Sequence, residues 1–157
     1  MLSDIRTASV RRRTPASPAA PRAKSKRRAV KSVETSPLIL VVDDYEDMRE
    51  TYAACLSDAG YRVEQAGNGQ EALEAMARSK PALVVMDLSM PVVDGWEATR
   101  RIKADAAMAD VFIIAVTGHS TEDGLRRATD LGADAVLTKP CAPGTILAGV
   151  WALLGRA

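Results

Sequence analysis

The chain has 157 residues, the length of one ordinary domain, and its 47% apolar and 26% charged residues are typical of a soluble globular protein. Its apolar runs are far shorter than the roughly 18 residues that a membrane-spanning helix needs, and residues 1–36 lack the apolar core of a secretory signal. We therefore expect a cytoplasmic protein. The net charge of +1 hides a division, because residues 1–36 carry ten Lys or Arg and two acids, whereas residues 37–157 carry eleven and eighteen.

Residues 1–36 come first in chain order and are rich in Arg, Ser, Ala and Pro. With no aromatic residue and no apolar periodicity, this segment cannot offset the entropy of ordering itself, so we predict a disordered basic tail. Such a tail could bind nucleic-acid phosphates or an anionic membrane surface without specificity, or could be an organelle transit peptide. We favour a solvated tether, or an upstream segment that is not translated in the cell, and we expect no specific nucleic-acid partner and no membrane span.

Apolar runs that predict strands begin directly after the tail. The runs at 38–42, 83–86 and 111–116 are continuous rather than alternating, which is typical of parallel strands covered on both faces. Two shorter strands are predicted at 61–65 and 135–137.

Helical patterns separate these strands, and Gly or Pro residues mark several of the helix ends. The predicted helices span residues 46–59, 69–79, 95–104, 121–131 and 143–154. Five strands alternating with five helices predict right-handed crossovers and an α/β fold, a three-layer sandwich around a five-stranded parallel sheet. We assign this domain to residues 37–157.

Polar residues stand at the carboxyl ends of four predicted strands. Asp43 and Asp44 follow the first strand and Asp87 closes the third. Thr117 closes the fourth strand, and Lys139 follows the fifth. In an open parallel sheet these ends lie along one edge, where sites form, so we expect the five side chains to converge. Taken singly, each has an ordinary structural explanation, such as an aspartate that caps the next helix.

The chemistry of this set favours a bound cation and a phosphoryl group. Three neighbouring carboxylates repel one another unless a cation lies among them, and ligands that are all oxygen suit Mg²⁺. One carboxylate can attack phosphorus to form an acyl phosphate. Lys139 and Thr117 would then contact phosphoryl oxygens, through charge and through a hydroxyl hydrogen bond.

With these residues in place, the chain resembles the receiver domain of bacterial two-component response regulators. The resemblance covers residues 37–154 and rests on four motifs in the family's order, which are ILVVDD at 39–44, DLSMPVVDG at 87–95, TG at 117–118 and LTKP at 137–140. It implies a flavodoxin-like, doubly wound sheet with strand order 2-1-3-4-5.

The resemblance also implies a role for each site residue. Asp87 would be the phosphoacceptor. Asp44, Asp87 and the backbone carbonyl of Ser89 would ligate Mg²⁺ directly, and Asp43 would act partly through water. Thr117 and Lys139 would engage the phosphoryl group, and a cis peptide bond would precede Pro140.

The partners implied by the family are a histidine kinase or a histidine phosphotransfer protein as phosphoryl donor. Phosphorylation would reshape the face formed by the last two helices and the last strand, which would contact an effector or a second copy of the chain. We expect a stand-alone receiver that signals by protein contact, since no output domain follows residue 157. It would not be an enzyme beyond its own phosphorylation and dephosphorylation.

Some positions depart from the family's pattern. Val136 stands where many receivers have a Tyr or Phe that moves with the threonine, so the usual aromatic coupling is unavailable. Cys141 replaces a common Phe, and we expect both cysteines to be buried thiols. Ser89 and His119 occupy the variable positions that tune acyl-phosphate hydrolysis in the family.

Three alternative interpretations fit parts of the sequence. A phosphatase of the haloacid-dehalogenase type also forms an aspartyl phosphate, but it expects D-x-D after the first strand, whereas Asp43 and Asp44 are adjacent. The second alternative is a receiver-like module that signals without phosphorylation. The intact site residues argue against it, although Val136 leaves room for it. Residues 67–72 fit the dinucleotide motif G-x-G-x-x-A, but no suitable acid follows, so we interpret them as a helix-starting turn.

The last predicted helix contains no charged residue. Ile146, Val150, Leu153 and Leu154 are predicted to face the sheet. Trp151 lies at the flank of this stripe, where it either packs over the helix edge or anchors a partner.

Overall fold

The computed structural model describes residues 35–90 and 92–156. Five parallel strands form one sheet in the order β2-β1-β3-β4-β5, which confirms the predicted topology. Reading along the chain, the strands are β1 (Leu38–Val42), β2 (Arg62–Ala66), β3 (Leu83–Asp87), β4 (Phe112–Thr117) and β5 (Ala135–Thr138).

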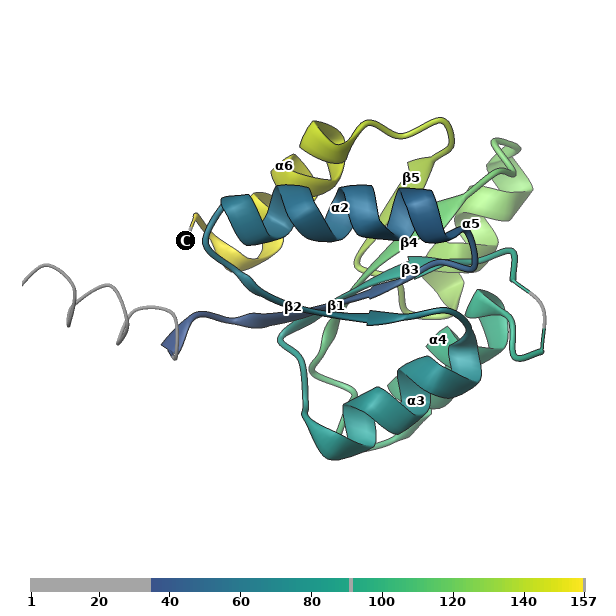
Figure 1. The fold of residues 1–157 in the computed structure, drawn as a ribbon. Helices are drawn as coiled ribbons and strands as arrows, with labels where there is room; N and C mark the ends of the chain where they lie inside the picture. Colours follow the sequence, from purple (N-terminus) through teal and green to yellow (C-terminus); the bar gives the residue numbers. More distant parts are fainter. Residues whose placement is uncertain (1–34, 91, 157) are drawn as a thin grey trace, which may run out of the picture.

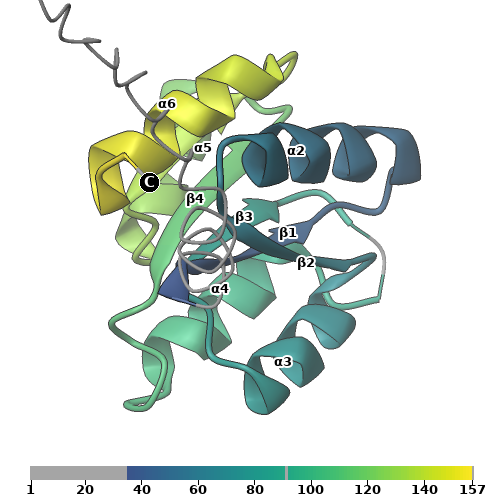
Figure 2. The same ribbon diagram turned by 60° about the vertical axis from the view of Figure 1, so that its left-hand side comes forward.

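Five helices cover the sheet on its two faces, as expected for this alternation of elements (Figure 1). They are α2 (Glu46–Asp58), α3 (Gly69–Arg78), α4 (Gly95–Ala104), α5 (Glu122–Asp130) and α6 (Pro143–Leu154). Figure 2 shows α2 and α6 on one side of the sheet and α3 and α4 on the other. Ala128 of α5 packs in the same apolar cluster as α3 and α4. The molecule is therefore a three-layer sandwich.

The two apolar clusters explain why the central strands read as continuous runs. In β1, Leu40 packs on the side of α3 and α4, whereas Ile39 and Val41 pack on the side of α2 and α6. All five residues of β1 and all five of β3 are buried. Successive side chains of a strand point to opposite faces, so a strand covered on both faces has no position for an exposed polar side chain.

Side-chain caps fix where three of the helices begin. Asn68, Asp94 and Thr121 each accept a hydrogen bond from the backbone N–H three residues later, at the starts of α3, α4 and α5. Observed and predicted bounds agree within one residue at every end of the five helices. The capped turn at Asn68 lies in the segment that fits the dinucleotide motif, and it agrees with our interpretation of a helix-starting turn.

The last helix packs as its pattern predicted. Ile146 and Val150 are buried, and Leu153 and Leu154 are partly buried against the same cluster. The Trp151 ring packs on this cluster too, and the Arg156 guanidinium lies 4.5 Å from its centroid. These contacts favour packing over the helix edge for Trp151.

Three further sequence predictions concern the tail, the cysteines and membrane spans. The predicted disordered tail lies, apart from residues 35 and 36, outside the described residues. Of the two thiols, Cys141 is buried as expected, whereas Cys55 is partly exposed, so that prediction is wrong for Cys55. Within residues 35–90 and 92–156, no helix has the length and apolar character to cross a membrane.

Candidate functional site

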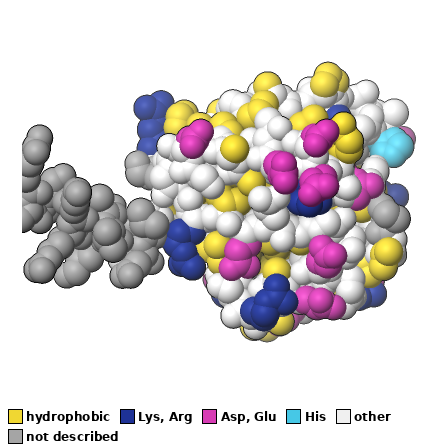
Figure 3. Space-filling view, viewed as in Figure 1, with side chains coloured by type: hydrophobic (Ala, Val, Ile, Leu, Met, Phe, Trp, Pro, Cys, Tyr) yellow, Lys and Arg dark blue, Asp and Glu magenta, His cyan; other side chains and the backbone are white. Residues whose placement is uncertain are grey.

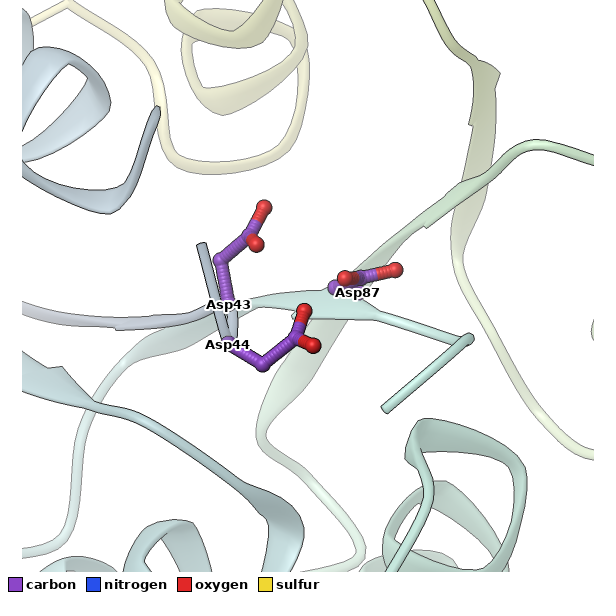
Figure 4. Close-up of side chains that lie close together, drawn as sticks. All are labelled: Asp43, Asp44 and Asp87. Carbon is purple, nitrogen blue, oxygen red and sulfur yellow. The ribbon is translucent and has the colours of Figure 1, made fainter. Parts of the chain in front are cut away.

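Three carboxylates meet where β1 and β3 end. The two strands are neighbours in register, with Val42 opposite Met86, so Asp43, Asp44 and Asp87 leave the sheet side by side. One carboxylate oxygen of each lies within 4.8 Å of those of the other two. Asp43 and Asp87 are buried and Asp44 is exposed. Figure 4 shows the Asp44 carboxylate turned towards Asp87.

Local hydrogen bonds hold the first of these aspartates in place. The Asp43 Oδ1 accepts a hydrogen bond from the backbone N–H of Tyr45 at 2.9 Å, and its carbonyl accepts one from Arg49 Nη1 at 3.0 Å. Tyr45, rather than an aspartate, stands at the N-cap of α2. The ordinary explanation of Asp43 or Asp44 as the cap of this helix is therefore wrong, and both carboxylates belong to the acidic cluster.

Lys139 reaches the buried carboxylates from β5, at the far side of the sheet. Its Nζ lies 3.2 Å from Asp87 Oδ2 and 3.4 Å from Asp43 Oδ2. The backbone N–H of Lys139 donates to the Thr117 carbonyl at 2.8 Å, which fixes the direction of the chain at this point. The peptide bond between Lys139 and Pro140 is cis, as the resemblance implied.

The loop after β3 supports Asp87 from its other side. The backbone N–H of Ser89 donates to Asp87 Oδ1 at 3.0 Å. Gly95, at the start of α4, packs so closely that an added Cβ would lie 1.9 Å from the Asp87 carbonyl oxygen. Only glycine fits there, which explains the glycine that closes the 87–95 motif.

Thr117 completes the set at the end of β4. Its neighbours in the sheet are β3, where Val116 pairs with Asp87, and β5, where Thr117 pairs with Thr138. The side chain is fully buried, and its Oγ1 accepts a hydrogen bond from the backbone N–H of His119 at 3.0 Å. All five side chains predicted from the strand ends therefore lie at one edge of the sheet.

The electrostatics of this edge show crowded negative charge. Burial, aided by the nearby Asp43 carboxylate, raises the pKa of Asp87 to about 6, because the Ser89 N–H and Lys139 only partly oppose these effects. Burial on its own would lower the pKa of Lys139, but the charges of Asp87 and Asp43 outweigh it and raise that pKa. The Lys139 ammonium contacts both buried carboxylates, and a divalent cation among the oxygens would neutralise the remaining negative charge.

Two supporting residues were missed by sequence reasoning. Arg49 of α2 bridges the Asp43 carbonyl and the Gln65 side chain, and so ties the acidic turn to β2. The buried Tyr52 hydroxyl donates to the Cys141 carbonyl at 2.8 Å and joins α2 to the loop that follows Lys139. Burial raises the pKa of Tyr52, so it remains a neutral donor. Both residues bond from α2 to backbone carbonyls, and nothing in the sequence at Arg49 or Tyr52 indicates these contacts.

A comparison with known families identifies this arrangement. The sequence profile described as the response regulator receiver domain matches residues 39–150. The chain belongs to the response regulator receiver family. This receiver domain is 37% identical over 118 residues to the phosphate regulon transcriptional regulatory protein PhoB of Pseudomonas aeruginosa, and 40% identical over 118 residues to the response regulator MprA of Mycobacterium leprae.

Those alignments cover 75% of this chain but 52% of PhoB and 51% of MprA, so the chain spans about half the length of the curated relatives it matches. A solved structure has the same fold over its own whole length. The chemotaxis response regulator CheY4 of Vibrio cholerae is 29% identical, with a TM-score of 0.72, and the match covers 76% of this chain and all of that one. The sequence resemblance and the flavodoxin-like fold are both confirmed.

Membership assigns this receiver domain to two-component signalling, a system in which receivers typically bind Mg²⁺. The residues present fit that ion, because three carboxylates within 4.8 Å of one another form an all-oxygen cluster and two of them are buried.

Proposed function

We propose that this receiver domain accepts a phosphoryl group on Asp87 from a phosphohistidine of a histidine kinase or a histidine phosphotransfer protein. The observation that carries the proposal is the position of the Asp87 carboxylate, which lies 3.2 Å from the Lys139 ammonium and has two further carboxylates close by. A buried acid so placed has a nucleophilic oxygen, a cation beside it and a site for a second cation.

The proposed reaction is a direct phosphoryl transfer. An Asp87 carboxylate oxygen forms a bond to phosphorus while the bond between phosphorus and the donor's imidazole nitrogen breaks. The imidazole keeps the electron pair of the broken bond, and the product is an acyl phosphate on Asp87. Transfer of this kind depends on positioning and charge neutralisation rather than on a strong base, so the aspartate needs no proton acceptor.

The metal would be held by the carboxylates of Asp44 and Asp87 and by the Ser89 carbonyl, with Asp43 acting partly through water. Bound there, Mg²⁺ would neutralise the carboxylates and the charge that develops on the phosphoryl oxygens. Asp43 also holds Lys139 through its Oδ2, so it orients the ammonium that faces Asp87.

The phosphoryl oxygens would be bound by Lys139 and Thr117. Lys139 offers a mobile point charge, and the Thr117 hydroxyl offers one hydrogen bond after a small movement of its strand end. His119 takes part in that movement, because its backbone N–H is bonded to Thr117 Oγ1. The loop after β4 would therefore follow the threonine.

The output surface in this proposal is formed by α5, β5 and α6, which would contact an effector protein or a second copy of the chain. A cavity of about 450 Å³ opens there, and it is lined by Leu125, Val136, Leu137, Thr138, Pro140, Cys141 and Thr145. Val136 lies in this wall at the position where many receivers have an aromatic ring. The cavity thus offers space for an apolar side chain of a partner.

The test is to incubate the protein with Mg²⁺ and acetyl phosphate and to weigh it intact. We expect a single phosphoryl adduct in the wild type, none after prior addition of EDTA, and none in Asp87→Asn. Asp130→Asn, which changes an exposed carboxylate at the end of α5, is the matched control and should label like the wild type.

A phosphorylated Asp87→Asn protein would mean that another carboxylate is the acceptor. A folded wild-type protein that binds Mg²⁺ and yet forms no adduct would favour the module that signals without phosphorylation. Continuous release of phosphate from a simple ester would favour the phosphatase alternative.

A further inference from the structure

A cation–π contact joins α4 to α5. The Arg127 guanidinium of α5 lies 4.5 Å from the centroid of the Trp96 ring, in the first turn of α4. Within residues 35–90 and 92–156, Arg127 forms no ion pair, whereas its neighbour Arg126 pairs with Glu122 of the same helix. The indole ring therefore takes the place of an acidic partner for Arg127, and the contact links two separate helices.

Trp96 is held in a fixed position relative to Asp87. It directly follows Gly95, whose close approach to the Asp87 carbonyl leaves no room for a side chain. The loop before α4 turns outwards at the exposed Val92, which has a left-handed φ of 72°. It returns at Val93, whose carbonyl accepts a hydrogen bond at 3.0 Å from the first N–H of α3. The Trp96 ring itself packs against the apolar cluster on this side of the sheet.

The helix that carries Arg127 is held much less firmly. Ala128 is the one buried residue of α5, whereas α3 and α4 have four buried residues each. A helix with few buried contacts can change its position at a low cost in free energy. The contact with Trp96 is therefore a large part of what fixes α5 next to α4.

The loop between β4 and α5 ties the start of this helix to Thr117. The Thr117 Oγ1 accepts a hydrogen bond from the His119 N–H at 3.0 Å, and Thr121 caps the helix by accepting from the Gly124 N–H. His119 is exposed, and the histidine colour in Figure 3 marks this loop at the molecular surface. A shift of Thr117 towards a phosphoryl group on Asp87 would therefore displace the start of α5.

Two cavities adjoin the stacked side chains and give α5 room to move. One has a volume of about 310 Å³ and is lined by Trp96, Arg127 and residues at the start of α5, including Gly124. The other, of about 200 Å³, is lined by the same two side chains and by Leu131 at the end of α5. A close-packed interface would resist displacement of the helix, whereas this open space allows it.

We propose that the stack of Arg127 on Trp96 couples the position of α5 to the state of Asp87, an inference that rests on the proposed function. In the unphosphorylated protein the stack stabilises the present position of α5. When Thr117 moves to the phosphoryl group, the start of α5 follows it while Trp96 stays with the Asp87 loop, so Arg127 leaves the ring.

This coupling takes the place of the usual aromatic switch. Val136 stands where many receivers have the moving ring, and it packs against the same apolar cluster as Trp96. The ring of this receiver thus lies on α4 rather than on β5. Because coupling between two sites is reciprocal, a contact that stabilises the resting position of α5 also lowers the affinity of the site for a phosphoryl group.

The test measures binding of beryllium fluoride, a mimic of the phosphoryl group, to the full-length chain at saturating Mg²⁺ by titration calorimetry. Arg127→Gln removes the cation, Trp96→Leu removes the ring, and Arg127→Lys keeps the positive charge. Arg126→Gln is the matched control, because it removes a neighbouring charge of the same helix that pairs with Glu122 instead. For fluorescence, a Trp151→Phe background leaves Trp96 as the single indole of the chain.

We expect Arg127→Gln and Trp96→Leu each to raise the affinity for beryllium fluoride by about two- to fivefold, the equivalent of one exposed cation–π contact. The double variant should gain no more than either single variant, because each already removes the whole contact. Arg127→Lys should lie nearer the wild type, and Arg126→Gln should match it.

The fluorescence of Trp96 gives a second readout. Beryllium fluoride should make the ring more accessible to quenching by acrylamide when Arg127 is present. In Arg127→Gln the ring should be accessible with and without the mimic. A contact that only stabilises the fold would lower the melting temperature in both variants and leave the affinity and this quenching pattern unchanged.

Unchanged affinity in Arg127→Gln, or an equal gain in Arg126→Gln, would overturn the inference and leave the proposed function intact. Arg127 is exposed, so this variant decides the matter even if Trp96→Leu fails to fold. A wild type that neither binds beryllium fluoride nor is labelled by acetyl phosphate would remove the proposed function, and the inference with it.

Discussion

The charged side chains at the two ends of the sheet differ in how far other groups of the chain neutralise them. At the end where the strands begin, Lys103 Nζ donates to the carbonyls of Ala109 and Val111 and to Asp134 Oδ2. The same Asp134 oxygen accepts from the Ile113 N–H. Every charge in this group has partners within the chain. At the end where the strands finish, two buried carboxylates share one ammonium.

The difference separates charges that the fold itself neutralises from charges that it leaves unbalanced. A satisfied group such as Lys103 with Asp134 stabilises the turn that leads into two strands, and it needs nothing from outside. The group around Asp87 concentrates negative charge that the chain alone does not balance, as the raised pKa of Asp87 indicates. The comparison can be tested by exchanging or removing one charge at each end.

The largest effect is expected for Lys139→Ala. Removing the ammonium 3.2 Å from Asp87 should slow phosphorylation by acetyl phosphate by about 100-fold or more, since one preorganised donor typically contributes that much to a transition state. Lys103→Ala should leave the rate within about twofold. Initial rates of adduct formation, measured by intact mass, distinguish the two. Equal effects of both variants would show that the two charged groups do not differ in their contribution to phosphorylation.

The reverse pattern is expected for stability. Lys103→Ala leaves the Val111 carbonyl and Asp134 without their cation, so we expect the free energy of unfolding to fall by about 1–3 kcal/mol. Lys103→Arg, which keeps the charge, is the control and should lose less. Urea unfolding followed by circular dichroism measures both. A stability loss that is larger in Lys139→Ala than in Lys103→Ala would contradict the assignment of roles.

A third prediction concerns pH and the buried carboxyl group of Asp87. The folded pKa of Asp87 is raised above its ordinary value of 3.8 to about 6, so the folded state binds the proton more tightly and loses stability as pH rises between these values. Without Mg²⁺, Asp87→Asn should therefore be about 1–3 kcal/mol more stable than the wild type at pH 7.5. The gain should vanish near pH 4.

Chemical unfolding at both pH values, with and without Mg²⁺, provides the measurement. Saturating Mg²⁺ should stabilise the wild type more than the variant, because the ion binds the folded site and the variant lacks one ligand. A wild type that is more stable than Asp87→Asn at pH 7.5 without Mg²⁺ would show that Lys139 alone balances the two carboxylates.

The smallest expected effect is a proton released on metal binding. At pH 6 the Asp87 carboxyl is about half protonated, so Mg²⁺ should displace about half a proton per site, and almost none at pH 8. Titration calorimetry in two buffers of different ionisation enthalpy gives this number. In Asp87→Asn the release at pH 6 should disappear, and its persistence would assign the proton to another group.

The charged residues at the carboxyl ends of the strands could be predicted from the sequence, whereas the charged contacts at the other end of the sheet could not. Asp87 and Lys139 were predictable because each stands where a continuous apolar run stops, and the topology brings such positions together. The contact of Lys103 with Asp134 gave no signal, since Lys103 looks like an ordinary surface charge and β4 and α5 separate the two residues in the sequence. Element bounds were predictable because Gly, Pro and capping residues act locally.

The residues missed at the site had a physical reason in common. Arg49 and Tyr52 bond backbone carbonyls, and a carbonyl carries no mark of residue type in the sequence. The exposure of Val92 was equally hidden, because one of two adjacent valines reads as part of the core. Its left-handed backbone follows from how the loop is anchored at Val93, which depends on the tertiary contact with Gly69.

The contact of Gly95 with the Asp87 carbonyl has a consequence for engineering. At that position a hydrogen atom is the only substituent that lets α4 begin against the end of β3. Any side chain there would act as a wedge, and the loop that carries Val92 would have to lengthen or swing outwards to accommodate it. Residue grafts and loop insertions intended to retune this domain should therefore leave the glycine untouched and be placed before it.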